Sequence, residues 1–112
     1  MIDIQIIRSL LMGQDEFIEE FATASIDSFG EFSDQVKTHL PDRNLEAFRH
    51  AGHKIKPVAQ MLEQEALLNG YEEAKDRLSR DASDESIQDS VETLTSLCEE
   101  IQEQFRSIIS SR

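Results

Sequence analysis

The strongest constraint on this chain is an apolar stripe with helical spacing near its C-terminal end. From Ser83 onward, apolar residues recur at alternating intervals of four and three, which places them on one face of an α-helix. Ser83, followed by Asp84 and Glu85, is typical of a helix N-terminus, because a hydroxyl can cap the first amides and carboxylates favour the positive end of the helix dipole. A helix of this length must bury its stripe against other elements. The stripe consists of Ile87, Val91, Leu94, Cys98, Ile101, Phe105 and Ile108.

Other segments carry the same periodicity. One helix is expected from about residue 15 to residue 39, a second begins after Pro41-Asp42, and a third, shorter helix ends near Leu78. The break between the second and the third is expected between Glu63 and Gly70, where Asn69-Gly70 is a possible turn. The predicted buried positions are Phe17, Phe21, Ser25, Phe29, Phe32 and Val36, then Leu45, Phe48, Gly52, Ile55, Ala59 and Leu62, then Leu67, Tyr71, Ala74 and Leu78, with Ile4, Ile7, Leu10 and Leu11 in a short N-terminal helix that covers one end.

The composition favours helix throughout. There are only four glycines and two prolines in 112 residues, and β-branched runs are few, so strands are not expected. Four amphipathic helices joined by short polar links can bury their stripes together only as a bundle. We therefore predict an all-α fold, an antiparallel four-helix bundle with a short extra N-terminal helix, in a single domain over residues 1–112.

The charge of the chain limits its partners. A formal charge of −12 argues against nucleic acid or an anionic membrane surface, since both would be repelled over most of the protein. Partners are therefore expected to be proteins. The lone Cys98 cannot form an internal disulfide, and neither an export leader nor a membrane-spanning run is recognised, so we expect a reducing, cytoplasmic setting. Within the apolar stripe, Cys98 is expected to be a small buried hydrophobe.

A histidine and a lysine stand one helical turn apart in the second long helix. At about 100° per residue, His53 falls roughly 130° from the mean direction of the apolar positions, so its side chain should be exposed. His50 projects almost opposite the core. Lys56 falls at the boundary, where its stem can lie on the bundle and its ammonium beside the imidazole of His53. This pattern suits a transferable phosphoryl group, because neutral imidazole, with an ordinary pKa of about 6.5, is a nucleophile and a nearby cation offsets the phosphoryl charge.

The pentad at 53–57, His-Lys-Ile-Lys-Pro, resembles the His-x-Leu-Lys-Gly phosphorylation motif of histidine-containing phosphotransfer (Hpt) domains. The histidine, the aliphatic residue and the second lysine agree in kind. Pro57 stands where the family has glycine, and Glu63 stands where a second glycine usually follows. The resemblance implies a four-helix bundle, often with a short extra N-terminal helix, in which the histidine lies partway along the second bundle helix. The order, number and length of the expected helices resemble those of an Hpt domain over essentially the whole chain.

The resemblance also implies a function. His53 would be the phosphoacceptor and Lys56 would neutralise the charge of the phosphoryl group. The chain would be a monomeric phosphocarrier in a multistep two-component phosphorelay, without a cofactor and without an ATP-binding or autokinase site. Its partners would be response-regulator receiver domains, a hybrid sensor histidine kinase, or both. The residues expected to contact a partner are Arg49, His50, Lys54, Pro57 and Gln60.

Two features of this segment bear on docking. From Arg43 to Gln60 there are four basic residues against the single acid Glu46, so a cationic patch is expected in an otherwise acidic chain. Such a patch suits a receiver domain whose phosphoacceptor aspartate lies in an acidic pocket. Pro57 removes the hydrogen bond to the carbonyl of His53 and is expected to kink the helix.

Other functions are less well supported by the sequence. No glycine-rich phosphate loop is present, so an ATP-dependent kinase is not expected. The dimerisation helix of a histidine kinase usually has an acid after its histidine, whereas Lys54 follows here. A metal site could use Glu46, His50 and His53, but matching ligands on a second helix are not evident. The main alternative is a helical-bundle adaptor that binds a partner without phosphotransfer and needs nothing from His53.

Overall fold

The computed structural model describes residues 4–10 and 14–110, and over these ranges the chain forms helices and short turns, with no strand. The predicted all-α class is therefore confirmed, and so is the short N-terminal helix. Ile7 of that helix is buried, whereas the side chains of Ile4 and Leu10, and the whole of Leu11, lie outside what the structure describes. The helices are α1 (Ile4–Leu10), α2 (Asp15–His39), α3 (Leu45–Met61), α4 (Glu65–Ser79) and α5 (Asp84–Ser110).

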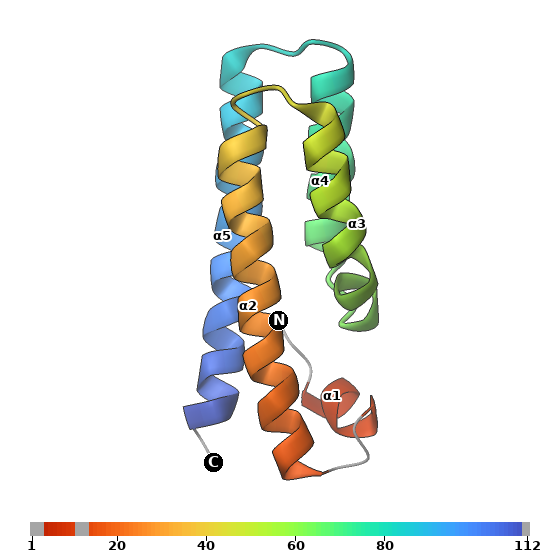
Figure 1. Cartoon of the computed structure of the whole chain (residues 1–112), viewed down its shortest axis with the longest axis vertical. Helices are drawn as coiled ribbons and strands as arrows, with labels where there is room; N and C mark the ends of the chain where they lie inside the picture. Colours follow the sequence, from red (N-terminus) through yellow and green to blue (C-terminus); the bar gives the residue numbers. More distant parts are fainter. Residues whose placement is uncertain (1–3, 11–13, 111–112) are drawn as a thin grey trace.

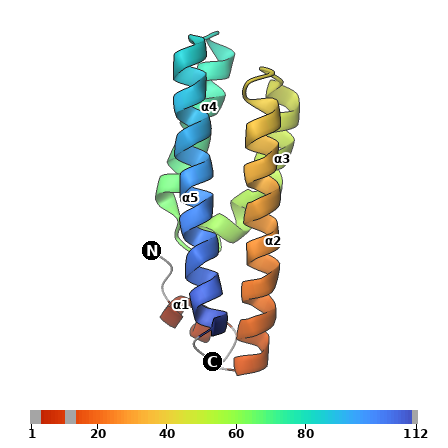
Figure 2. The same cartoon turned by 90° about the vertical axis from the view of Figure 1, so that its left-hand side faces the viewer.

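Helices α2 to α5 form the expected antiparallel four-helix bundle, and the molecule measures 46 × 20 × 19 Å along its principal axes (Figure 1). Each of these helices packs on its neighbours in the chain, and α2 also packs on α5, so α3 lies diagonally opposite α5. The α3–α4 hairpin covers only one part of the longer α2–α5 pair, and α1 lies at the other end (Figures 1 and 2). The face of α3 that points away from α2 and α4 is open to solvent.

Helices α2, α3 and α4 end in the same way. Arg43, Glu63 and Asp81 follow them and have φ values of 56°, 56° and 53°, in the left-handed region. In each case the next amide donates to the carbonyl five residues back, at 2.9–3.0 Å, as in a Schellman motif. These ends turn the chain sharply and allow short links between antiparallel helices. The three bonds run from Asn44 to His39, from Gln64 to Ala59 and from Ala82 to Arg77.

Side chains mark the beginnings of α3 and α5. The side chain of Asn44 accepts a hydrogen bond from the amide of Ala47 at 3.1 Å, so α3 begins after Asn44 rather than directly after Pro41-Asp42. The hydroxyl of Ser83 accepts from the amide of Ser86 at 3.2 Å. The predicted start of the last helix at Ser83 is therefore confirmed, with side-chain capping as the physical reason.

The break between α3 and α4 lies at residues 62–64, at the edge of the predicted interval. Asn69-Gly70, the possible turn, lies inside α4 instead. The reason is the packing of α4: Leu67 and Tyr71 are both buried, so an uninterrupted helix through Gly70 places them on one face.

Among the residues whose burial the structure describes, one predicted core position is exposed. Phe17 was expected to be buried, but it is 45% exposed. At this end of α2 the buried positions are Ile18 and Ala22, and Phe17 precedes Ile18 by one residue, which rotates its side chain about 100° away from that of Ile18. Ser25 is buried as predicted. The positions that are only half-buried are Phe21, Leu45, Leu78 and Ile108.

Cys98 is fully buried in α5, as expected for a small hydrophobe. Desolvation by the core raises the pKa of its thiol to about 12, so the reactive thiolate is not formed at neutral pH. Within the described ranges, no helix has the length and apolar character needed to cross a membrane.

The left-handed end of α3 gives a first prediction. Glu63→Gly should stabilise the protein by about 0.5–1 kcal/mol, because glycine adopts a positive φ without the steric penalty, and its greater freedom in the unfolded chain offsets only part of this gain. Urea unfolding followed by circular dichroism measures the change. Gln60→Gly, at an exposed position inside α3, is the matched control and should destabilise by about 1 kcal/mol. A loss of stability in Glu63→Gly would contradict the account of this turn.

Candidate functional site

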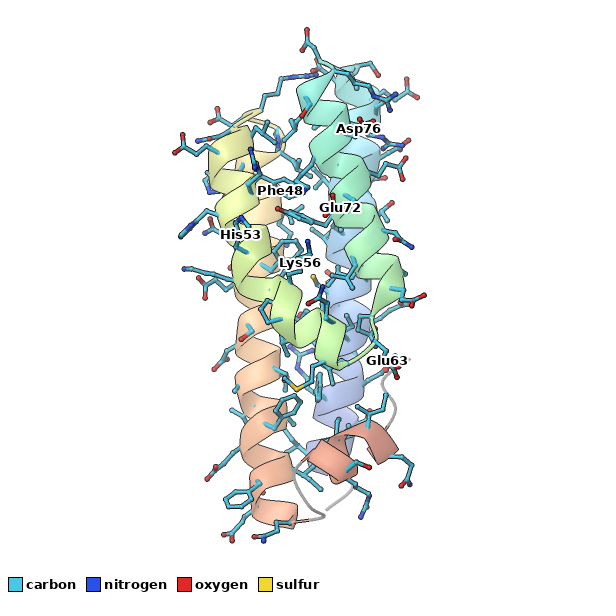
Figure 3. The ribbon with its side chains drawn as sticks, turned by 90° about the vertical axis from the view of Figure 1, so that its right-hand side faces the viewer. Phe48, His53, Lys56, Glu63, Glu72 and Asp76 are labelled. Carbon is cyan, nitrogen blue, oxygen red and sulfur yellow. The ribbon has the colours of Figure 1, made fainter. Side chains whose placement is uncertain are left out.

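His53 lies on the solvent-exposed side of α3, near the middle of the helix (Figure 3). The opposite face of α3 is buried through residues at helical spacing, so the direction of His53 is fixed by the core. His50 is exposed one turn earlier, as the helical geometry predicted. The site therefore consists of an accessible imidazole on a helix that is anchored along its other face. The buried residues of α3 are Phe48, Ala51, Gly52, Ile55 and Ala59.

Lys56 points to α4 rather than to His53. Its Nζ lies 3.6 Å from the Oε1 of Glu72, whose Oε2 lies 3.0 Å from the Nζ of Lys75. Figure 3 shows Lys56 and Glu72 between the two helices. The hydrogen bond from Lys75 is the main cause that holds the pKa of Glu72 below its usual value, and the charge of Lys56 adds to it. The spacing had suggested a contact between the Lys56 ammonium and the imidazole of His53. Within the described residues, the structure does not form this contact.

The cationic patch is smaller than the sequence indicated. Arg43 donates to Asp81 at 3.1 Å and to Asp84 at 2.8 Å, and so fastens the α2–α3 turn to the α4–α5 turn. Lys54 lies 3.6 Å from Glu31 of α2. With Lys56 engaged by Glu72, three of the four basic residues in this segment have carboxylate partners on other elements, which counting along the chain could not reveal.

The five expected docking residues are exposed, and four of them divide among three hollows. Arg49 and His50 line a shallow hollow on the outer face of α3 together with His53. His50 and Lys54 line a groove of about 170 Å³ between α2 and α3. Gln60 lies in a third hollow, beside α1. His53, Arg49 and His50 thus share one hollow, while Lys54 and Gln60 line the other two.

Pro57 lies inside α3, which continues through it to Met61. The last part of the helix bends across the bundle towards α4 (Figure 3). This bend agrees with the expected effect of a proline, whose ring displaces the chain and whose missing amide leaves the carbonyl of His53 without its helical donor. Pro57 itself is exposed, one turn beyond His53.

The backbone next to His53 is supported by Tyr71 of α4. A Cβ at Gly52 would collide with the ring and hydroxyl of Tyr71, so the close approach of the two helices requires glycine there. The Tyr71 hydroxyl donates to the carbonyl of Arg49 at 3.3 Å, the carbonyl that also accepts the amide of His53 in a regular α-helix. The ring packs 5.0 Å from that of Phe48. Burial is the main cause that raises the pKa of Tyr71, so its hydroxyl remains a donor.

Neither Tyr71 nor Glu72 was recognised as part of the site from the sequence, although Tyr71 and Gly52 were both placed in the core. A glycine within the buried face of a helix was the available signal, because such a glycine often marks close packing. For Glu72 the signal was weaker. Once the turn is placed at residues 62–64, Lys56 and Glu72 are equally far from Gln64 and therefore face one another across the hairpin.

Among the described residues, no three or more His, Cys, Asp and Glu side chains converge as metal ligands would, and Glu46, His50 and His53 are included in that search. Comparison of the chain with protein-family models, with curated proteins and with solved structures found no significant match. The candidate function therefore depends on the geometry of α3 and its neighbours.

The contact at Gly52 yields the second prediction. Gly52→Ala should destabilise the protein by about 1–3 kcal/mol, because the added methyl group displaces the buried ring of Tyr71. Thermal and urea unfolding would measure this change.

Gly30→Ala is the matched control for this change. Its added methyl group would meet only the side-chain amide of Gln102, at 2.9 Å, and the far end of that side chain can move. Its free energy of unfolding should stay within about 1 kcal/mol of the wild type, since better helix propensity offsets the disturbed amide. Equal effects at the two glycines would mean that the Tyr71 contact is unimportant.

Proposed function

We propose that this chain is a histidine phosphotransfer protein that carries a phosphoryl group on His53 between receiver-domain aspartates of a multistep phosphorelay. The observation that carries the proposal is the exposure of His53 in the middle of α3, on a helix whose opposite face is fixed in the core of a four-helix bundle. A carrier must present its nucleophile to two different partners, so an accessible side chain on a rigid element serves better than one in a closed pocket.

The reaction needs little from the chain beyond this presentation. An imidazole nitrogen of His53 attacks the phosphorus of an aspartyl phosphate, the bond from phosphorus to the carboxylate oxygen breaks, and the aspartate leaves as a carboxylate. Transfer to the next receiver is the same exchange with the roles reversed. Lys56, one turn from His53, offsets the charge on the phosphoryl oxygens when its side chain turns to them.

The helix ends add support. The second glycine usual in the family corresponds to Glu63, which has a φ of 56°. Glycine is the preferred residue in this conformation, so the fold calls for glycine where the family has it. The departure at Glu63 therefore concerns stability rather than the site. Pro57, the other departure, lies on the exposed surface beside His53 and leaves the ring accessible.

Phosphorylation of His53 gives the third prediction. Incubation with a phosphorylated receiver domain should label the wild type with acid-labile, base-stable phosphate, because phosphohistidine has that chemistry. His53→Gln should take up none and should retain its helical circular dichroism. His50→Gln, at the exposed histidine one turn away, is the control and should still be labelled.

The same experiment discriminates between functions. Labelling that persists in His53→Gln and disappears in His50→Gln would move the phosphoacceptor to His50. If no receiver from the source organism labels the wild type, the adaptor function, which requires no chemistry at His53, becomes the better account.

The fourth prediction tests the docking surface. Pro57→Phe adds a bulky exposed side chain one turn from His53 and should reduce receiver binding and transfer at least tenfold, with the fold intact. Pro57→Gly should preserve both. Ser96→Phe, on exposed α5 surface diagonally opposite α3, is the control and should bind like the wild type. Titration of each variant with a receiver by calorimetry measures binding. Full binding by Pro57→Phe would mean that the docking surface lies elsewhere.

A further inference from the structure

We infer that Glu72 regulates the site by competing for Lys56, so that the stability of a phosphoryl group on His53 is limited by an ion pair between α3 and α4. The inference rests on the proposed function and adds a residue from a second helix to it. Glu72 is a positioning residue in this scheme: it acts through Lys56 and does not itself contact the phosphoryl group.

The geometry places Lys56 between two possible partners. In the structure its ammonium lies 3.6 Å from Glu72, longer than a good charged hydrogen bond, and the side chains of Lys56 and Glu72 are 42% and 52% exposed. Lys56 is also one helical turn from His53, within reach of a group attached to that imidazole. Solvent-exposed ion pairs of this kind are weak. Lys56 can therefore leave Glu72 when a stronger anion appears.

The release of Lys56 leaves Glu72 with a partner. Lys75 lies 3.0 Å from the other carboxylate oxygen and has a side chain only 27% exposed. Its ammonium also lies 4.9 Å from the centre of the Tyr71 ring, which holds it near α4. A doubly paired carboxylate can give up the longer of its two contacts without becoming an unpaired charge. Lys75 thus makes the exchange of Lys56 easy.

The consequence is a competition that can be measured. A phosphoryl group brings close to two negative charges, more than the single charge of Glu72, so Lys56 should turn to phosphorylated His53. In the unmodified protein, only molecules with Lys56 released from Glu72 are ready to stabilise the phosphoryl group. The stabilisation of phosphohistidine by Lys56 is therefore scaled by the fraction of molecules in which Lys56 is released, as for any binding-competent state that is partly populated. Removing the charge of Glu72 should remove this reduction.

The test uses the full chain and a small phosphodonor, so no partner has to be known. Phosphoramidate transfers its phosphoryl group to imidazole: its phosphorus–nitrogen bond breaks, a new one forms to the ring, and ammonia leaves. With a fixed excess of ammonia, ³¹P NMR gives the equilibrium constant for this exchange. For Glu72→Gln, the fifth prediction is a rise of about two- to fivefold over the wild type, the range expected from an exposed ion pair.

A double-mutant cycle separates competition from simple repulsion. Lys56→Gln should lower the equilibrium constant, and adding Glu72→Gln to Lys56→Gln should change it no further. Glu73→Gln is the matched control: Glu73 is the next residue of α4, but its carboxylate pairs with Arg77 at 2.6 Å, and its loss should leave the constant at the wild-type value.

Two results would overturn this inference and leave the proposed function intact. An unchanged equilibrium constant in Glu72→Gln, with Lys56→Gln still lowered, would show that Glu72 does not compete for Lys56. An equal rise in the presence and absence of Lys56 would show that Glu72 repels the phosphoryl group directly. If phosphoramidate places no phosphoryl group on His53 in the wild type, the proposed function fails as well, and the two failures are thereby distinguished.

Discussion

The contact between Gly52 and Tyr71 sets the distance between α3 and α4, and most features of the site depend on that distance. The ring occupies the space that a side chain at position 52 would need, and its hydroxyl donates to the carbonyl of Arg49. Because the ring is also packed against Phe48, α3 is held in place from the side opposite His53. The same close approach brings Lys56 within 3.6 Å of Glu72. Support for the histidine and the placement of its neighbouring cation therefore have one origin in the packing of the core.

The fold was largely predictable because each helix is indicated by a local sequence pattern. Apolar spacing located the long helices, and the N-cap at Ser83 was identified from residue type alone. Phe17 was wrongly assigned to the core because the predicted stripe followed phenylalanines spaced four residues apart. The bundle instead buries Ile18 and Ala22 at this end of α2. The sequence pattern indicated an interval for the α3–α4 turn but not its exact position. Glu63 adopts a left-handed conformation there, which is not expected from a glutamate.

The site was less predictable than the fold, and the reason is that ion pairs are formed across elements. The exposure of His53 follows from helix geometry, so the sequence sufficed for it. The partners of Arg43 lie on the α4–α5 turn and at the start of α5, and those of Lys54 and Lys56 lie on α2 and on α4, respectively. No periodicity along α3 carries that information. The expected contact between Lys56 and His53 assumed that the two residues are each other's nearest polar neighbours, and α4 supplies a carboxylate instead.

These ion pairs also bear on how an acidic protein presents a cationic site. In a chain of net charge −12, lysines on the surface readily find carboxylates, and Lys54 and Lys56 both do so at 3.6 Å. A receiver domain with an acidic pocket would exchange one carboxylate partner for another, so little net binding energy is gained from each lysine. What the exchange does provide is selection, because a partner without well-placed acids would leave these lysines with their own carboxylates. Under the proposed function, affinity for a receiver would come from apolar and shape contacts around His53, and the charges would determine which partner is accepted.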